Sequence, residues 1–512
     1  MTDDSRSTHW LRWAGLLAGP LLCWLTASVL PHQFVAADGS LSQFTWAGRA
    51  TLGVMIWMGV WWLTEAIEIS VTALLPIALF PLLGVASAQE ACFPYADPLI
   101  FLYFGGFIIA LSMERWGLGR RVALLTLRTV GTSAPAMVAG FMLVTAGLSA
   151  FVSNTATTAM MLPIALSVIK LLQQQTSESK EQRAAVARFS TCLLLSIAYS
   201  ASVGGIMTVI GTPTNTFLIG FIRDKIASEY RQDFSFAGWL PIGVSLAGTF
   251  LPIIYFVLTR YLFPIRGIEL QGGRALVDRE LRTAGKVGTG EWNTLIIFLI
   301  TVALWLFRPL LNSWELEWSG SAYRPLQDLS DTVIAMTGAL LLFLTPVKFS
   351  TRTFTMDWEQ AAQMPWGILF LFGGGLSLAA AVQANGVAEF IGSQTGLFSD
   401  LSPLLLVLIV TTVIVFLTEL TSNAATTASL VPVLAALAPG VGMHPYLLII
   451  PATVAASCAF MLPVATPPNA IVFGSGKITV PQMVRAGFAL NLIAIVLVTG
   501  LTWLVVKPWL DL

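Results

Sequence analysis

Two polar tracts of nearly the same composition lie far apart in this chain, and apolar sequence flanks both. Residues 153–159 read Ser-Asn-Thr-Ala-Thr-Thr-Ala, and residues 422–428 read Ser-Asn-Ala-Ala-Thr-Thr-Ala. Their offset (422 − 153 = 269) also relates Ser149 to Thr418 and Gly105 to Gly374. Hydroxyl and amide groups that recur at membrane depth in two halves of a chain are typical of a transporter whose repeats share one binding site.

A second matched pair follows the two tracts. Residues 211–215 read Gly-Thr-Pro-Thr-Asn and residues 465–469 read Ala-Thr-Pro-Pro-Asn, at an offset of 466 − 212 = 254. Proline in an apolar helix removes a backbone donor and frees a carbonyl upstream, so both runs predict a helix break. Freed carbonyls with Ser, Thr and Asn oxygens are hard neutral ligands that suit Na⁺, while helix N-termini and side-chain donors suit a carboxylate or another oxyanion.

The tracts carry no fixed positive charge. A buried anion there needs co-bound cations to offset its desolvation, and this requirement predicts symport. The alternative is that small and hydroxylated residues only pack helices closely, which is their usual role in membranes. Repetition at a fixed offset favours binding for the two tracts, whereas Gly105, Gly106 and the three glycines at 373–375 are interpreted as packing residues.

Four carboxylates lie close to apolar segments. Glu65 and Glu68 follow the Trp-Trp-Leu-Thr run at 61–64, and they are predicted to lie at the membrane interface rather than in a proton relay. Glu114 and Glu419 lie near the spans that carry the polar tracts, and for them both interpretations stay open.

The composition excludes a soluble globule. Of the 512 residues, 56% are hydrophobic and only 11% are charged, where a soluble domain carries about 25% charged residues. Zero net charge gives no indication of a nucleic-acid partner. His9, His32 and His444 are isolated in sequence, and no nucleophile–base pair is evident, so neither an enzyme nor a cofactor is expected. The four cysteines are interpreted as small packing residues.

Apolar runs of membrane-spanning length recur along the whole chain. Eleven spans are predicted, the first being a retained helix rather than a signal peptide: 11–30, 48–63, 69–86, 98–113, 190–221, 237–262, 291–308, 331–347, 365–386, 445–475 and 486–506. Residues 134–172 and 401–438 carry the polar tracts near their middle, which leaves each half short for a full crossing. Each is predicted to be a re-entrant hairpin whose tip is surrounded by protein or by a watery cavity. The polar stretch 170–189 is predicted to be a solvated loop.

The distribution of Lys and Arg supports this topology with a cytoplasmic N-terminus. The predicted inside loops are basic, whereas the outside loops 87–97, 387–400 and 439–444 contain no Lys or Arg. The exceptions fall in outside loops that also contain acidic residues: Arg223, Lys225, Arg231, Arg308 and Arg324. The spans that carry Gly105 and Gly374 then run in opposite directions, so the repeats are inverted and one hairpin enters from each side.

Together these features resemble the divalent anion/sodium symporter family, which transports dicarboxylates, citrate or sulfate. The resemblance rests on the two Ser-Asn tracts, on the Thr-Pro-x-Asn runs at 212–215 and 466–469, and on Trp-Trp-Leu-Thr-Glu-Ala at 61–66, and it spans nearly the whole chain. It implies an all-α polytopic membrane protein with eleven transmembrane helices and two re-entrant hairpins. It also implies a homodimer and an elevator-type transport domain that moves against a fixed scaffold.

The resemblance also implies residue roles. One Na⁺ site is expected at Ser149, Ser153, Asn154 and Gly211, and a second at Thr418, Thr421, Asn423 and Ala465, with Thr421 and Ala465 contributing backbone carbonyls. Nine residues are expected to contact the substrate: Ser153, Asn154, Thr155, Thr212, Pro213, Ser422, Asn423, Thr466 and Pro467. Two positions depart from the family pattern, because Ala424 stands where many members have Thr and Glu68 stands where Pro is common.

Four parts are predicted along the chain. Residues 1–97 form N-terminal scaffold helices, 98–235 the first repeat with its hairpin at 134–172, 236–364 scaffold helices with a cytoplasmic linker, and 365–512 the second repeat with its hairpin at 401–438. The expected location is the inner (plasma) membrane, in which the chain is a multi-pass protein.

The function predicted from sequence is sodium-coupled import of a small divalent anion, with a C4-dicarboxylate favoured. Sulfate or citrate symport and sodium-independent exchange remain alternatives, although the lack of Lys, Arg or His at the cation positions disfavours exchange. An ion channel is the alternative from another class. It predicts a polar stripe along several helices, which the sequence does not display.

Overall fold

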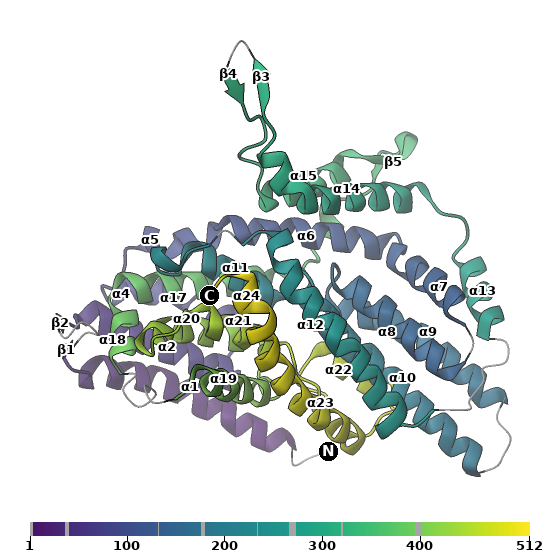
Figure 1. The fold of residues 1–512 in the computed structure, drawn as a ribbon, viewed down its shortest axis with the longest axis horizontal. Helices are drawn as coiled ribbons and strands as arrows, with labels where there is room; N and C mark the ends of the chain where they lie inside the picture. Colours follow the sequence, from purple (N-terminus) through teal and green to yellow (C-terminus); the bar gives the residue numbers. More distant parts are fainter. Residues whose placement is uncertain are drawn as a thin grey trace.

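The computed structural model describes residues 4–35, 40–131, 133–175, 180–232, 234–265, 273–318, 321–394 and 401–512. Helices dominate these residues, and three two-stranded antiparallel hairpins join some of them (Figure 1). The hairpins are β1 (Gln33–Val35) with β2 (Leu41–Gln43), β3 (Leu316–Trp318) with β4 (Ser321–Tyr323), and β5 (Pro346–Lys348) with β6 (Thr353–Phe354). The β3–β4 hairpin projects away from the helical body (Figure 1).

The chain up to the first polar tract consists of helices of mixed length. They are α1 (Asp4–Val29), α2 (Trp46–Thr64), α3 (Ile69–Thr72), α4 (Leu75–Leu82), α5 (Ala88–Cys92), the 3₁₀ turn η1 (Phe93–Ala96), α6 (Pro98–Arg115) and α7 (Leu118–Val130). Long α1 and α2 pack against each other. Glu65 caps the end of α2 with a left-handed backbone and pairs with Arg12 of α1 at 3.1 Å, both side chains being about half exposed. This exposed ion pair is consistent with the interfacial interpretation of Glu65.

The first tract and its break lie in four helices. These are α8 (Ala134–Ser149), α9 (Asn154–Gln175), α10 (Lys180–Ile206) and α11 (Pro213–Asp224). After the turn η2 (Ser228–Tyr230), the chain continues through α12 (Phe236–Phe256), which ends in the π-helical η3 (Val257–Leu262).

The middle of the chain is again mostly helical. It contains α13 (Gly273–Thr283), α14 (Thr289–Asn312), α15 (Asp331–Leu344), η4 (Phe349–Thr351), α16 (Trp358–Ala361), α17 (Trp366–Ala384) and α18 (Val387–Ser393). The second tract and its break then occupy α19 (Pro403–Leu417), α20 (Asn423–Gly440), α21 (Tyr446–Ala456) and α22 (Pro467–Gly474). The chain ends with α23 (Val480–Leu501), η6 (Thr502–Val506) and α24 (Lys507–Trp509).

The predicted spans coincide largely with helices, but one predicted loop differs from expectation. The predicted loop at 170–189 is wrong: α9 extends to Gln175 and α10 begins at Lys180, with residues 176–179 outside the described part. The Ala, Arg, Gln and Glu residues of this stretch are good helix formers, so both helices continue beyond their apolar segments. The helix breaks predicted at the two Thr-Pro-x-Asn runs are confirmed, because the spans 190–221 and 445–475 are interrupted between Ile206 and Pro213 and between Ala456 and Pro467.

Seven of the described helical segments are long and apolar enough to cross a membrane: Ala88–Arg115, Asn154–Gln174, Glu181–Ile206, Phe236–Leu262, Thr289–Asn312, Trp366–Ala384 and Val480–Trp509. Several shorter apolar helices accompany them, among them Ala134–Ser149 and Pro403–Leu417. The protein is therefore a mostly helical, multi-pass membrane protein.

The matched glycines of the two halves serve close packing, as the sequence predicted. A methyl group added at Gly105 would lie 2.8 Å from the Ala335 backbone, and one added at Gly374 would lie 2.2 Å from the Ala73 carbonyl oxygen. Gly117 and Gly386, also 269 residues apart, precede α7 and α18 with φ of 68° and 69°. Only glycine adopts this left-handed backbone without strain, which explains its presence at both bends.

Ion pairs gather the charged ends of the helices into two groups. Arg120, Arg121 and Arg128 of α7 pair with Glu280, Glu291 and Asp278, and Arg115 pairs with Asp357. All of these residues except Glu291, the first residue of the predicted span 291–308, belong to segments that the charge pattern assigned to the cytoplasm. Of the predicted outside exceptions, Arg223 pairs with Asp97, Arg308 with Asp331, and Arg324 with Glu315. Acidic partners therefore account for three arginines that departed from the pattern.

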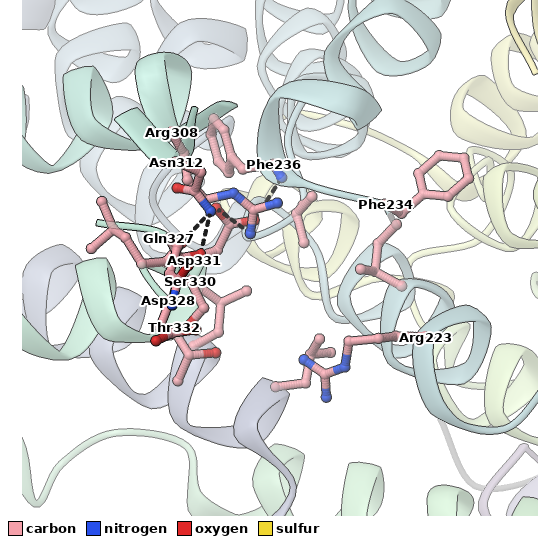
Figure 2. A pocket seen from close by; sticks show the side chains of 15 residues that line it. Arg223, Phe234, Phe236, Arg308, Asn312, Gln327, Asp328, Ser330, Asp331 and Thr332 are labelled. Atoms are coloured by element: carbon pink, nitrogen blue, oxygen red, sulfur yellow. Dashed lines mark hydrogen bonds and ion pairs between the residues drawn. The ribbon is translucent and has the colours of Figure 1, made fainter. Parts of the chain in front are cut away.

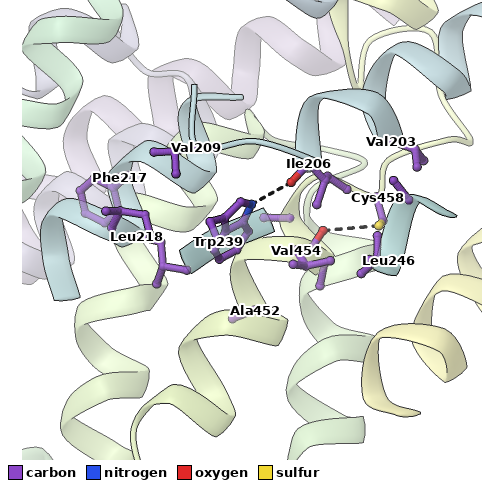
Figure 3. Close-up of a cluster of buried hydrophobic side chains, with 14 of the residues drawn as sticks. Val203, Ile206, Val209, Phe217, Leu218, Trp239, Leu246, Ala452, Val454 and Cys458 are labelled. Atoms are coloured by element: carbon purple, nitrogen blue, oxygen red, sulfur yellow. Dashed lines mark hydrogen bonds between the residues drawn. The ribbon is translucent and has the colours of Figure 1, made fainter. Parts of the chain in front are cut away.

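A buried apolar cluster surrounds the interruption between α10 and α11 (Figure 3). Trp239 of α12 is fully buried and donates its indole N–H to the Ile206 carbonyl at 2.9 Å, which satisfies a group left free where α10 ends. Of the cysteines, Cys23, Cys192 and Cys458 are buried packing residues as predicted, whereas Cys92 is exposed.

Candidate functional site

Each polar tract forms a turn between two helices, and both of these helices pack against the same third helix. In the first half α8 ends at Ser149 and α9 begins at Asn154, and both pack against α10. In the second half α19 ends at Leu417 and α20 begins at Asn423, and both pack against α21. The turns at 150–153 and 418–422 are thereby held next to the helices that break further along.

The first turn brings three oxygen atoms together. The Ser149 hydroxyl lies 2.5 Å from Asn154 Oδ1 and 2.8 Å from the Ala201 carbonyl oxygen. One hydroxyl carries one proton, so it cannot fully satisfy both acceptors. The cluster is consequently rich in oxygen lone pairs, which is the arrangement a small hard cation stabilises.

The second turn repeats this geometry. The Thr418 hydroxyl lies 2.7 Å from Asn423 Oδ1 and 2.8 Å from the Ala456 carbonyl oxygen. Nearby Thr421 is buried, and its hydroxyl lies 2.7 Å from that of Thr426. The predicted pairs Ser149 with Asn154 and Thr418 with Asn423 are thus in direct contact in both halves.

The helix breaks are closed by matched asparagines. Asn215 donates its side-chain amide to the carbonyls of Ile206 and Thr208 at 3.0 and 2.8 Å. Asn469 donates to Ala459 and Leu462 at 3.2 and 3.0 Å. Both side chains are fully buried, and Oδ1 of each has no hydrogen-bond partner among the described residues. Two buried acceptors at equivalent positions are left for a bound ion or water.

The four helices that begin at the tracts and breaks share one feature, their positive N-terminal ends. α9 starts at Asn154, α11 at Pro213, α20 at Asn423 and α22 at Pro467. Thr212 and Thr466 precede α11 and α22 with nearly the same backbone, φ −141° and ψ 144° against φ −142° and ψ 149°. Unpaired N–H groups at such ends attract anions.

The two halves interlock at these breaks. α9 of the first half packs against α22 of the second, and α20 packs against α11. Thr214 and Ser457 place their hydroxyls 2.8 Å apart, and Tyr199 donates to the Phe460 carbonyl at 2.9 Å. Residues more than 200 positions apart therefore build one polar region.

The remaining predicted site residues lie around this region with different exposure. Gly211, Thr212, Ala465 and Thr466 are buried, Ser153, Asn154, Pro213, Ser422 and Asn423 are partly buried, and Thr155 and Pro467 are exposed. Ser153 accepts the Ala156 backbone N–H at 3.2 Å, and Thr466 accepts that of Asn469 at 3.3 Å. Thr155 and Pro467 are therefore the members of this region that the described residues leave most uncovered.

Glu419 is the main functional candidate for which sequence reasoning reached no decision. Its buried carboxylate accepts the backbone N–H groups of Phe460, Met461 and Leu462 and the side-chain amide of Asn491, at 2.7 to 3.1 Å. Glu419 therefore connects the turn of the second tract to the non-helical segment between α21 and α22. A carboxylate one residue after Thr418, where the first half has Ala150, was the available sequence signal.

A pocket lies elsewhere, at the ends of α6, α11, α12, α14 and α15 (Figure 2). This cavity of about 260 Å³ contains Arg223 and Arg308, both with acidic partners, and Asn312. None of the predicted substrate residues lines it, although Val209 of the first break does. Residues of α11 and α12 line one part of it, and residues of α14 and α15 line another.

Sequence comparison connects the whole chain with transporters. Residues 22–509 match the family described as the sodium:sulfate symporter transmembrane region. The chain is 39% identical over 501 residues to the sodium-dependent dicarboxylate transporter SdcS of Staphylococcus saprophyticus, covering 97% of this chain and 92% of that protein. It is 38% identical over 486 residues to SdcS of Staphylococcus aureus, with 94% and 89% covered. These relatives are named as transporters, not as enzymes.

Solved structures agree at the level of the fold. MtrF of Neisseria gonorrhoeae, from a class described as antimetabolite efflux pumps, has a TM-score of 0.58 at 12% identity, covering 97% of this chain and 96% of that chain. The YdaH transporter of Alcanivorax borkumensis has a TM-score of 0.58 at 11% identity, with 97% of both chains covered. Since the family match runs through both polar tracts and both helix breaks, this chain belongs to the sodium:sulfate symporter family.

Proposed function

We propose that this protein is a secondary active transporter that couples Na⁺ to the import of a small divalent anion, with a C4-dicarboxylate as the preferred substrate. The observation that carries the proposal is the matched pair of oxygen clusters at Ser149–Asn154 and Thr418–Asn423. The relatives named sodium-dependent dicarboxylate transporters favour both the ion and the substrate class.

Each oxygen cluster holds one Na⁺ in this proposal. The first ion is bound by Ser149, Ser153, Asn154 and Gly211, and the second by Thr418, Thr421, Asn423 and Ala465. All of these are neutral oxygen donors, which suit a hard monovalent cation. The ions bring the positive charge that the tracts lack, and they lower the cost of burying an anion between them.

The substrate lies between the two ions and the two tips. Hydroxyl and amide groups of Ser153, Asn154, Thr155, Ser422 and Asn423 donate to its carboxylates. Thr212 with Pro213 and Thr466 with Pro467 bring the positive ends of α11 and α22 to the same place. Substrate and cations bind together because each compensates for the buried charge of the other.

The topology of the proposal has eleven transmembrane helices and two re-entrant hairpins in inverted repeats. α8–α9 enters from the cytoplasm and α19–α20 from outside the cell. The lengths of α8 and α19, 16 and 15 residues, support helices that end inside the membrane. The protein resides in the inner (plasma) membrane as a homodimer.

Transport in this proposal follows an elevator mechanism. The interlocked helices α8 to α11 and α19 to α23 move as one body, which carries the complete site across the membrane. α12, which the sequence assigned to the scaffold, moves with this body in the proposal because it packs against α10 and α23. α1 to α6 and α14 to α17 form the scaffold against which it slides. The cavity of Figure 2 lies along the boundary between these two groups, which is where a sliding body leaves imperfect packing.

Sulfate is the second candidate because of one residue. Ala424 follows Asn423 at the second tip, where the first tip has Thr155. The missing hydroxyl makes the second half poorer in donors, so a smaller oxyanion than a four-carbon dicarboxylate is compatible with the tip.

The deciding experiment is uptake into proteoliposomes that contain the purified protein. We expect saturable uptake of labelled succinate in a Na⁺ gradient and little uptake with K⁺ or choline, and weaker competition by sulfate than by other dicarboxylates. Uptake independent of Na⁺ that requires internal dicarboxylate would identify an exchanger. Ion conduction without saturable uptake would identify a channel.

A further inference from the structure

The two halves differ at two matched positions beside the cation clusters. At the offset of 254 residues, Gly205 corresponds to Ala459 and Gly211 to Ala465. The break of the first half therefore lacks two methyl groups that the break of the second half carries. In the proposed function each of the two helix breaks contributes a ligand to one Na⁺ site, so a difference between them indicates a difference between the two sites.

Hydrogen bonds establish that these positions are equivalent in space as well as in sequence. Asn215 lies within 3.5 Å of the Gly205 carbonyl oxygen, and Asn469 donates to the Ala459 carbonyl at 3.2 Å. Each asparagine folds its break onto the end of the preceding helix in the same way.

The first cluster has no room for either methyl group. A carbon added at Gly205 would lie 2.5 Å from Asn154 Oδ1 and 3.0 Å from the Gly211 carbonyl oxygen. One added at Gly211 would lie 2.5 Å from the Gly205 carbonyl oxygen and 2.9 Å from that of Ala150. The atoms that would collide are thus oxygens, and they surround the place assigned to the first Na⁺.

The second cluster accommodates both methyl groups because a longer side chain separates its parts. In the first half the Thr208 hydroxyl donates directly to the Ala150 carbonyl. At the corresponding positions of the second half, the Glu419 carboxylate extends from the tip and accepts the Leu462 N–H at 3.1 Å. The second tip thus supplies a carboxylate side chain where the first tip supplies the Ala150 backbone carbonyl.

We infer that the two cation sites differ in size, and that Gly205 and Gly211 determine the cation selectivity of the first and tighter site. Their hydrogen atoms let Asn154 approach the broken helix closely, so the ligand oxygens surround a small cation. Ala459 and Ala465 keep the second site wider. The inference rests on the proposed function and adds to it which residues discriminate between monovalent cations.

The test measures cation binding directly, with transport as a second readout. Purified wild type, Gly205→Ala and Ala459→Gly are titrated with Na⁺ and with Li⁺, and the rise of the unfolding temperature with concentration gives an apparent dissociation constant for each ion. Gly147→Ala is the matched control, because that glycine of α8 has open space around it.

We expect Gly205→Ala to weaken Na⁺ binding by about tenfold, and Li⁺ binding by more, since displacing Asn154 spreads the ligands and the smaller ion loses most. Gly205→Ala therefore raises the ratio of the Li⁺ to the Na⁺ dissociation constant. Ala459→Gly lowers this ratio, because the second site can contract around the smaller ion. Gly147→Ala leaves both constants unchanged.

Several outcomes would overturn the inference. A folded Gly205→Ala with wild-type constants for both ions excludes a selective role for that glycine. If Gly205→Ala fails to fold, the result for Ala459→Gly tests the inference. An unchanged ratio of the Li⁺ to the Na⁺ dissociation constant in that variant refutes a difference in size between the two sites. Wild-type protein that neither binds nor transports with Na⁺ contradicts the proposed function instead, so the two failures are distinguishable.

Discussion

At the residue scale, two asparagine side chains of the candidate site each take part in two features of the structure. Asn154 and Asn423 each accept a hydroxyl contact within the oxygen cluster and each begin a helix at the tip. Because the same amide serves cation and substrate in the proposed function, its loss affects both. Their equivalent positions make the two residues a direct test of a shared site.

We expect Asn154→Ala and Asn423→Ala each to reduce Na⁺-dependent uptake at least about tenfold, since a hydrogen bond to a charged group contributes roughly 1.5–3 kcal/mol. Expression and the unfolding temperature without ligand should stay near those of wild type, because both residues are only partly buried. Uptake in proteoliposomes is the measurement. Full uptake by either purified variant would contradict a site built from both halves.

The departure at Ala424 is a second residue-scale test. Ala424→Thr adds a hydroxyl where Thr155 has one in the other tip, so we expect affinity for a matching dicarboxylate to change by about tenfold. The proposed ligands of the second Na⁺ are untouched, and the sodium activation curve should hardly shift. Competition by succinate, citrate and sulfate with sodium titrations tests this. An unchanged competition profile with a large loss of sodium affinity would assign Ala424 to the cation site.

At the element scale, the boundary between the proposed moving body and the scaffold is held by carboxylates at helix ends. Asp97 caps α6 and pairs at 2.6 Å with Arg223 at the end of α11. Asp331 at the start of α15 accepts the first N–H of α12 from Phe236 at 2.8 Å. Both contacts join elements that an elevator motion would separate.

We expect Arg223→Gln to lower the free energy of unfolding by about 1–3 kcal/mol, because it removes a cation from nearly buried Asp97 while Arg223 itself is about a third exposed. If the motion is of the elevator type, the same change also alters the uptake rate without altering sodium affinity. Thermal unfolding and uptake kinetics measure the two effects. Arg223→Lys, which keeps a cation beside Asp97, serves as the control, and failure of both readouts to change in Arg223→Gln would exclude a role for this contact.

At the scale of the whole molecule, the charge groups and the hairpins predict sidedness. Gln173 at the end of α9 and Gln394 after α18 are both exposed and lie at opposite ends in the proposed topology. Gln173→Cys should react with a membrane-impermeant thiol reagent only from the cytoplasm, and Gln394→Cys only from outside. The background requires Cys92→Ser, since Cys92 is exposed. Labelling of both positions from one side would contradict inverted repeats.

The sequence by itself determined the local chemistry of this protein. Apolar runs, prolines and the spacing of Lys and Arg act within a few residues of themselves, so helices, their interruptions and the charged ends could be read directly. The repetition at 269 residues related Ser149 to Thr418 and Asn154 to Asn423, while the family resemblance implied that Ser149 lies with Asn154 and Thr418 with Asn423. Each pair lies only five residues apart, so its contact is local. The polar start of α10 was misjudged, since polarity alone does not distinguish a loop from a solvated helix end.

Only the tertiary structure decided which distant residues meet. Glu419 contacts backbone 41 to 43 residues away and Asn491 72 residues away, and these contacts depend on how α19 packs against α21 and α23. The packing of α9 on α22 and of α20 on α11 likewise depends on the entire chain. Close approach at Gly205 follows from the same packing, because the space around a glycine is set by its neighbours in space and not by its neighbours in sequence.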